Sequence, residues 1–133
     1  MERTAIRVLI VDVALQRENQ VADAVLAAGF SSRVVSDSVS AIGSLDVWRP
    51  TVVVVDLRSP SGEARHFCDM LAAYPKDAAP PVVFVAEGPN LLKRAAVNPA
   101  GLVAAPVDPD QLTATVLRVA QHTTTAHDGA LAR

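Results

Sequence analysis

Two aspartates stand where apolar runs of strand length end, and carboxylates at such places can do chemistry. Asp56 follows the run 52–55, and Asp12 follows the run 6–11. In open parallel sheets, ligands bind in the crevice at the carboxyl ends of the strands. Two carboxylates on adjacent strand ends would form an acidic pocket suited to a hard cation or to phosphoryl chemistry.

The elements that must position these aspartates are short strands. The apolar runs that predict them are 6–11, 33–35, 52–55, 82–85 and 102–104. The first, third and fourth runs are continuous rather than alternating, which is typical of strands covered on both faces. Helical patterns lie between the runs, and right-handed crossovers then make the strands parallel. The sequence therefore predicts an α/β fold, a doubly wound five-stranded parallel sheet in a three-layer α/β/α sandwich.

Apolar stripes at helical spacing predict the helices. Gly29, Pro50, Pro75 and Pro99 follow four of them as stops, and Asp108 caps the start of the last. The stripes are Val21, Val25, Ala28; Val39, Ile42, Leu45; Phe67, Met70, Leu71, Tyr74; Leu91, Leu92, Ala95, Ala96; and Leu112, Val116, Val119. This periodicity is lost beyond residue 121, so we expect one domain over 1–121 and a flexible C-terminal tail or linker over 122–133.

Composition excludes several classes of protein. The chain has 133 residues, 50% hydrophobic and 20% charged, which suits one soluble globular domain. A net charge of −2 provides no overall electrostatic attraction to nucleic acid, so we expect no direct nucleic-acid binding. The apolar runs fall far short of the ~20 residues of a membrane helix, and no signal peptide precedes the first strand. With Cys68 as the only cysteine, the expected location is the cytoplasm, away from the membrane.

Several segments resemble the receiver domains of two-component response regulators. They are VLIVD at 8–12, PT at 50–51 leading into VDLRSP at 55–60, PVVFV at 81–85 and APVDPDQL at 105–112. The resemblance covers about residues 6–119, and it implies a flavodoxin-like receiver domain over 1–121 with strand order 2-1-3-4-5. It also implies a phosphorelay signalling domain rather than an enzyme, with a histidine kinase or phosphotransfer protein as partner.

The same resemblance assigns roles to individual residues. Asp56 would be the phosphoacceptor, whose carboxylate attacks phosphorus. Asp12, Asp56 and the backbone carbonyl of Arg58 would bind a divalent cation, usually Mg²⁺, which offsets the repulsion between the anions. The bond before Pro106 would be cis, as the matching bond often is in that family, although trans is the general default for proline.

Other positions depart from the family pattern. Val13 replaces the second acid at the end of the first strand, and Leu102 replaces an aromatic that usually switches on signalling. Ala86 replaces a hydroxyl residue that hydrogen-bonds the phosphoryl group. Glu87 stands where a small residue normally admits the phosphodonor. Ala105 replaces a lysine that pairs with the phosphoryl oxygens, and alanine cannot do so.

These departures weaken the expected chemistry. Each lost charge-assisted contact is worth about 1.5–3 kcal/mol, and losing several would slow phosphorylation by orders of magnitude. We therefore hypothesise an atypical receiver, or pseudo-receiver, in which phosphorylation of Asp56 is impaired or absent and Mg²⁺ binding is weakened. Arg58 could lean towards the two acids and offset their charge. The alternative is a functional Mg²⁺-dependent aspartyl-phosphate receiver that uses Asp12, Asp56 and either Glu87 or Arg58.

The loop 56–63 gives a finer resemblance, because it is short and keeps a Ser-Pro-Ser core at 59–61. It resembles the receiver half of the nitrate- and amide-responsive antiterminators that carry a three-helix RNA-binding domain (the ANTAR type). On the alternative hypothesis the chain would control such an output domain in transcription antitermination. The sequence here stops soon after the last expected helix.

The receiver resemblance also implies a binding surface for a protein partner or a second copy. It comprises the fourth helix, the fifth strand and the fifth helix. Its apolar candidates are Leu91, Leu92, Val97, Leu102, Val107 and Val116.

Plainer interpretations compete with these. Asp56 could cap a turn, Cys68 is more often a buried hydrophobe than a nucleophile, and His66 lacks a second ligand at metal spacing. A nucleotide site is disfavoured because the first strand–helix turn lacks glycine, and a hydrolase because no G-x-S-x-G pattern occurs.

Overall fold

The computed structural model describes residues 2–11, 20–58, 62–87 and 99–131, and for 122–131 the backbone alone. Its centre is a five-stranded parallel sheet with the order β2-β1-β3-β4-β5. The strands are β1 (Arg7–Val11), β2 (Ser31–Val35), β3 (Val52–Asp56), β4 (Val82–Ala86) and β5 (Gly101–Ala104). The predicted fold class and strand order are confirmed.

The three central strands are buried because their residues are almost all β-branched or apolar. Every residue of β3 and β4 is buried, and β1 is buried from Val8 onwards. The edge strand β2 is mostly exposed, and its sequence is correspondingly polar. Burial thus increases from the edge strand to the central strands, which explains why the continuous valine runs were a reliable signal for the interior strands.

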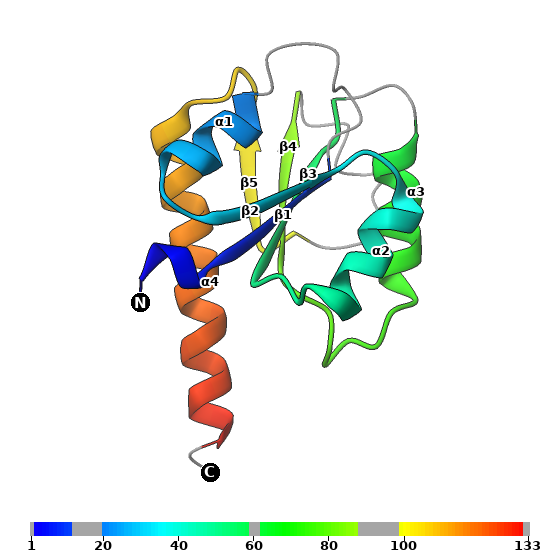
Figure 1. Cartoon of the computed structure of the whole chain (residues 1–133), viewed down its shortest axis with the longest axis vertical. Coiled ribbons are helices and arrows are strands. Elements are labelled where there is room, and N and C mark those ends of the chain that lie inside the picture. Colours follow the sequence, from blue (N-terminus) through cyan, green and yellow to red (C-terminus); the bar gives the residue numbers. More distant parts are fainter. Residues whose placement is uncertain (1, 12–19, 59–61, 88–98, 132–133) are drawn as a thin grey trace.

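Helices cover both faces of the sheet (Figure 1). After a short 3₁₀ turn, η1 (Arg3–Ala5), the described helices are α1 (Gln20–Ala27), α2 (Ser38–Val47), α3 (Glu63–Ala72) and α4 (Pro109–Leu131). Helices α1 and α4 pack on one face, and α2 and α3 pack on the other. The expected helix around 91–96 lies outside the described residues.

Alternation along the strands divides the core into two layers. In β3, Val52 and Val54 face α1 and α4, whereas Val53 and Val55 face α2 and α3. The predicted inward residues of the last helix, Leu112, Val116 and Val119, are all buried. No helix in the described part of the chain is long and apolar enough to cross a membrane.

The structure differs from the sequence pattern in two helices. Regular structure does not end at residue 121, because α4 continues to Leu131 and extends past the sheet (Figure 1). The boundary between a domain 1–121 and a tail 122–133 stays a prediction. On α2, Val39 does not face the core: it is 70% exposed, and Ala41 and Leu45 are buried instead. Ala41 and Leu45 share one side of the helix, and Val39 lies on the opposite side.

Candidate functional site

Asp56 is the last residue of β3 and lies at the carboxyl edge of the sheet. Its register partner is Val85 of β4, and the next amide, Leu57 N, donates to the Val85 carbonyl at 2.8 Å. On the other side of β3, Val55 pairs with Val11, the last residue of β1. Asp12 and Val13 follow Val11 but lie outside the described residues, so the expected pairing of Asp12 with Asp56 stays a prediction.

The Asp56 carboxylate is held by Arg58 through three hydrogen bonds. Arg58 Nε donates to Oδ1 at 2.9 Å, and a terminal guanidinium nitrogen donates to Oδ2 at 2.7 Å. The Arg58 backbone amide adds a third bond to Oδ1 at 3.0 Å. The planar guanidinium fork matches the carboxylate, which makes this the strongest kind of side-chain pair.

Burial makes this pair necessary. The Asp56 side chain is 4% exposed and the Arg58 side chain 26%, and Asp56 is the one charged residue classed as buried among those described. A buried carboxylate without a counter-charge would be costly, because desolvation removes the water that stabilises it. Arg58 therefore neutralises Asp56 from within the chain, which was the role left open for it from the sequence.

The surrounding strand ends add little further polarity. Ala86, the last residue of β4, is buried, and its carbonyl accepts a hydrogen bond from Ala105 N at 2.9 Å. Glu87 follows it and is exposed. The structure thus brings Ala86 and Ala105 together beside the edge that carries Asp56, and neither has a side chain that could bind an anion.

Two further positions have a defined geometry. The peptide bond between Ala105 and Pro106 is cis. Leu102 on β5 is 45% exposed, on the strand side opposite the buried Val103.

In the described part of the site, a Mg²⁺ ion would have to share the Asp56 carboxylate with Arg58. That cation takes oxygen ligands, chiefly carboxylates and carbonyls, and both oxygens of Asp56 already accept bonds from Arg58. No group of three or more His, Cys, Asp or Glu side chains that could hold a metal ion occurs among the residues placed in the structure.

A second polar cluster joins α2 to α3, and the sequence carried no signal for it. Ser38 Oγ lies 2.8 Å from His66 Nδ1, and Glu63 lies 3.8 Å from the same nitrogen. The arrangement contains the residue types of a catalytic triad but not its geometry, because serine and acid share one ring nitrogen. Ser38 is also buried, so the cluster is a link between helices rather than a nucleophile.

Cys68 is fully buried on α3, as expected for a small hydrophobic residue. Burial, with a smaller contribution from the charge of Asp69, raises the pKa of its thiol to about 11. The thiolate is the nucleophilic form, so this cysteine is unreactive at neutral pH.

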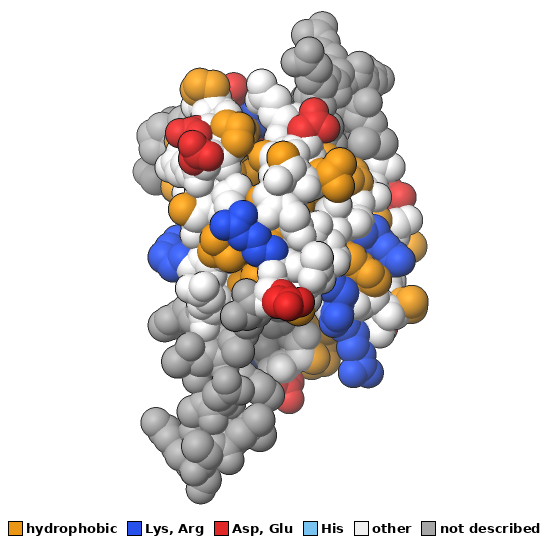
Figure 2. Space-filling view, turned by 60° about the vertical axis from the view of Figure 1, so that its left-hand side comes forward, with side chains coloured by type: hydrophobic (Ala, Val, Ile, Leu, Met, Phe, Trp, Pro, Cys, Tyr) orange, Lys and Arg blue, Asp and Glu red, His pale blue; other side chains and the backbone are white. Residues whose placement is uncertain are grey.

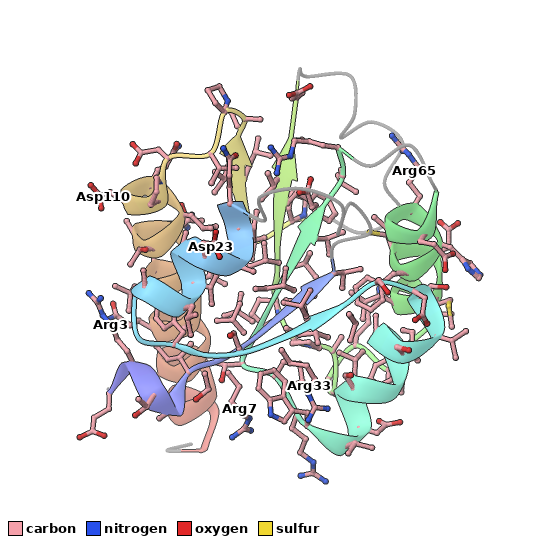
Figure 3. The ribbon with its side chains drawn as sticks, turned by 45° about the horizontal axis from the view of Figure 1, so that its top comes forward. Arg3, Arg7, Asp23, Arg33, Arg65 and Asp110 are labelled. Carbon is pink, nitrogen blue, oxygen red and sulfur yellow. The ribbon has the colours of Figure 1, made fainter. Side chains whose placement is uncertain are left out.

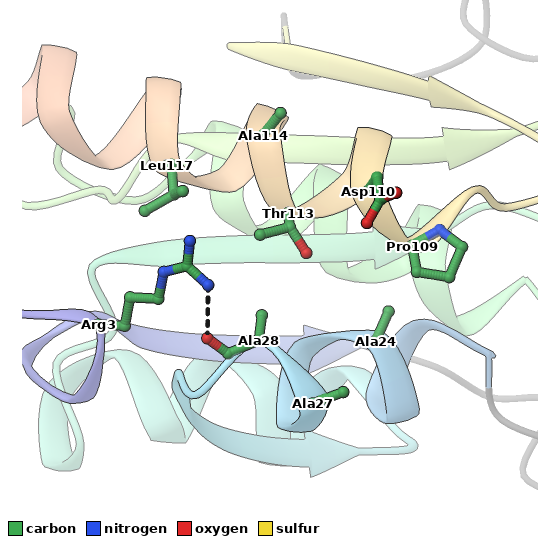
Figure 4. Close-up of a pocket in the computed structure, with 9 residues that line it drawn as sticks. All are labelled: Arg3, Ala24, Ala27, Ala28, Pro109, Asp110, Thr113, Ala114 and Leu117. Carbon is green, nitrogen blue, oxygen red and sulfur yellow. Dashed lines mark hydrogen bonds between the residues drawn. The ribbon is translucent and has the colours of Figure 1, made fainter.

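A groove of about 400 Å³ runs between α1 and α4 (Figure 4). Its walls are mainly small residues, with Arg3 at one end and Asp110 at the other. Arg3 donates to the Ala28 carbonyl at 3.0 Å, which ties η1 to the end of α1. Asp56 and Arg58 do not line the groove. Of the buried polar side chains in the described chain, only Thr115 belongs to α4.

Comparison with known proteins gives structural neighbours only, since no family model matches the chain and no curated protein matches it. The chain resembles the chemotaxis response regulator CheY4 of Vibrio cholerae, with a TM-score of 0.69 and 21% identity over 86% of this chain and 98% of that one. It resembles the receiver domain of a modulated diguanylate cyclase from Desulfovibrio desulfuricans G20, with a TM-score of 0.73 and 21% identity over 90% and 97%.

NtrX from Brucella abortus gives a TM-score of 0.77 at 18% identity, over 97% of this chain but 30% of NtrX. All these identities are low, and what the neighbours share with this chain is the three-dimensional arrangement. The chain has the fold of a response-regulator receiver domain.

Proposed function

We propose that this chain is an atypical receiver domain of phosphorelay signal transduction that acts mainly through protein–protein interaction. In this proposal Asp56 is phosphorylated poorly or not at all. The observation that carries it is the bidentate pair between Arg58 and Asp56 at the carboxyl end of β3.

The pair opposes phosphoryl transfer in a direct way. A carboxylate oxygen must approach phosphorus in line and donate an electron pair to it. Here both oxygens already accept hydrogen bonds from one guanidinium, which lowers their nucleophilicity, so the attack is easier when that pair opens. Once opened, the site offers alanine at 86 and 105, where receiver domains have a hydroxyl and a lysine. Neither would stabilise the phosphoryl oxygens.

The proposed partner surface is the one formed by β5, the start of α4 and the segment before β5. In its described part, Leu102 is exposed and Val107 is half-buried, whereas Val116 is fully buried and belongs to the core. Leu91, Leu92 and Val97 lie outside the described residues. A histidine kinase, a phosphotransfer protein or an output protein would bind here without a phosphate-dependent switch.

The alternative function is an authentic Mg²⁺-dependent phosphoacceptor, which could regulate an output domain such as that of an antiterminator. One observation favours it: Arg58 is already at the site and is a quarter exposed. If its guanidinium turned away from Asp56, it could bind the phosphoryl oxygens as the missing lysine does.

Intact-mass measurement after incubation with acetyl phosphate and Mg²⁺ tests the proposal. The wild-type protein should gain no stable phosphoryl group, while a receiver with an unmodified site serves as the positive control. The variant carrying both Ala86→Thr and Ala105→Lys restores the missing hydroxyl and cation and should be modified measurably faster. Asp56→Asn in that background should abolish the gain.

Rapid, stoichiometric and Mg²⁺-dependent addition to wild-type Asp56 would overturn the proposal in favour of the alternative. A modified wild-type protein whose rate falls at least about tenfold in Arg58→Ala would assign Arg58 to phosphoryl binding.

A further inference from the structure

The outer face of α2 carries an exposed apolar stripe. Val39 is 70% exposed and Val47 is 83% exposed. Gly43 lies between them, and a Cβ placed on it would meet no atom within 4 Å. Residues spaced by four share one side of a helix, so these three lie along one side of α2, where the exposed Asp46 stands beside them.

The inner face of the same helix is apolar as well. Ala41 and Leu45 are buried there against the sheet and α3. A helix that is apolar on opposite sides is normally covered on both. In the structure α2 is covered on one side, so its outer face has the composition of an interface.

Other exposed apolar side chains do not form such a strip. Leu26 on α1 is 69% exposed, but it is the one large apolar side chain exposed on the described part of that helix. The face of the molecule turned forward in Figure 2 likewise shows apolar side chains in small separate patches between charged ones.

The stripe is symmetric about its glycine. Val39 and Val47 each lie four residues from Gly43, on opposite sides of it. A reversed copy of α2 therefore presents the same pattern, valine against valine with glycine at the centre. In a two-fold interface each contact occurs twice with the partners exchanged, so the contact between Val39 and Val47 would form on both sides of the glycine.

The amino-terminal end of α2 is acidic. Asp37 caps the helix, and its carboxylate accepts hydrogen bonds from the Ser40 amide at 2.7 Å and the Ser40 hydroxyl at 2.9 Å. The bond from the Ser40 amide is the main cause that lowers the pKa of Asp37, so this group is charged at neutral pH. Glu63 adds a second carboxylate at this end, where it accepts from Ser38 N at 3.4 Å.

The carboxyl-terminal end of α2 has more basic than acidic groups, and its one described carboxylate, Asp46, accepts a hydrogen bond from Tyr74. Arg49 follows the helix, and its carbonyl accepts two bonds from the Arg7 guanidinium, at 3.0 and 2.7 Å. The Arg33 guanidinium lies 5.1 Å from the ring centre of Trp48, the residue that ends the helix. Arg7 and Arg33 point to the same region beside this end of α2 (Figure 3).

We propose that the outer face of α2 binds the same face of a second copy of this chain, with the two helices antiparallel and Gly43 at the two-fold axis. The antiparallel arrangement places the acidic end of each helix beside the basic end of the other. A parallel arrangement would place like charges together. Glycine at the axis lets the two helix backbones approach closely, with the valines packed on either side.

This inference does not depend on the chemistry of Asp56, which lies at the carboxyl edge of the sheet and not on α2. The contact is small, because one helix face contributes well under the roughly 1,200–2,000 Å² of a standard interface. We therefore expect a weak, reversible dimer with a dissociation constant between about 10 µM and 1 mM.

Sedimentation velocity of the full chain, from about 10 µM to 1 mM, measures this association. The wild-type protein should shift from monomer to dimer over that range. Val47→Glu should weaken the dimer at least about tenfold, because it buries a charge in the contact and faces an acidic end. Leu26→Glu places the same charge at an equally exposed apolar residue on α1 and should leave the association unchanged.

Cysteine cross-linking tests the orientation. The residue on a two-fold axis meets its own copy, so Gly43→Cys should form a disulfide-linked dimer on mild oxidation. Leu26→Cys should not, and native Cys68 is buried and cannot interfere. A wild-type protein that stays monomeric at 1 mM would overturn the proposal and leave the stripe to a different protein. So would a dimer that survives Val47→Glu or dissociates equally with Leu26→Glu.

Discussion

The carboxyl edge of β3 and the outer face of α2 differ in whether the chain itself supplies a partner for their side chains. At the edge, a buried carboxylate receives three hydrogen bonds from Arg58, two residues further along the chain. On α2, the side chains of Val39 and Val47 are exposed, with Gly43 open between them. The buried carboxylate at the edge thus has its counter-charge within the chain, whereas the two valines on α2 are left uncovered.

This difference changes which region is expected to interact with other molecules. A paired, desolvated charge gains little from an external ligand, because that ligand must first replace the internal partner. An exposed apolar strip gains free energy whenever another surface covers it. The comparison therefore supports the proposal that this chain acts mainly through protein–protein contact.

The largest expected effect comes from removing the internal cation at the edge. Arg58→Ala leaves the buried Asp56 carboxylate without its counter-charge and should lower the free energy of unfolding by about 3 kcal/mol. Urea denaturation at neutral pH measures it. Arg58→Lys keeps the charge but loses the planar fork, so its loss should be intermediate.

Asp56→Asn combined with Arg58→Ala provides the matched control. If the two side chains act as a pair, the double variant should lose clearly less stability than the sum of the single variants. Additive losses would show that Arg58 stabilises the protein by other contacts, and the contrast between edge and helix would lose its basis.

A second prediction concerns the buried side of the α2–α3 layer. Burial raises the pKa of Cys68 to about 11 from 9.0. The pKa of Cys68 is higher in the folded than in the unfolded protein. The contribution of the protonated thiol to stability is therefore complete below pH 9 and is lost as the pH rises towards 11. The free energy of unfolding should fall by about 2 kcal/mol over that window.

Urea denaturation at pH 8, 9.5 and 11 checks this result against Cys68→Ala. The hydrogen bond that Tyr74 donates to Asp46 raises the pKa of Tyr74 too, so both proteins should weaken somewhat. The wild type should weaken more. Equal pH profiles for the two proteins would mean that the thiol is accessible to solvent and that this layer is less closed than the structure shows.

The smallest expected effect is a gain in monomer stability from a substitution on the outer face of α2. Gly43→Ala adds a methyl group in open space and removes a flexible residue from a helix, so it should stabilise the monomer by roughly 0.5–1 kcal/mol. Thermal denaturation at low protein concentration measures this. Gly101→Ala is the opposite control, because its Cβ would lie 2.7 Å from Thr115 Cγ2 and should destabilise. A loss of stability with Gly43→Ala would mean that the outer face of α2 is not open at this residue.

The sheet was predictable because its strands carry a strong local signal. Runs such as 52–55 and 82–85 are continuous and β-branched, and they coincide with buried strands to within a residue. The orientation of α2 was not predictable in the same way. Its apolar residues surround the helix, so spacing alone could not decide whether Val39 or Ala41 faces the sheet. The path of the chain across the sheet decides it.

The position of Asp56 at the edge of the sheet was predictable from the sequence, but its pairing with Arg58 was not. The end of β3 placed Asp56 at the edge of the sheet, as expected from the strand pattern. Whether Arg58 turned towards it or towards solvent depended on tertiary burial, which no local pattern encodes. The contact between Ser38 and His66 joins residues 28 positions apart and had no signal at all.

The most direct measurement of the internal pairing of Asp56 is a Mg²⁺ titration followed by ¹H–¹⁵N NMR, with the amides of Leu57 and Arg58 as reporters. In the wild-type protein these resonances should not move beyond the change caused by ionic strength, since Arg58 already occupies both carboxylate oxygens. In Arg58→Ala they should shift in a saturable way. Saturable shifts of the same size in the wild-type protein would contradict the proposed role of Arg58.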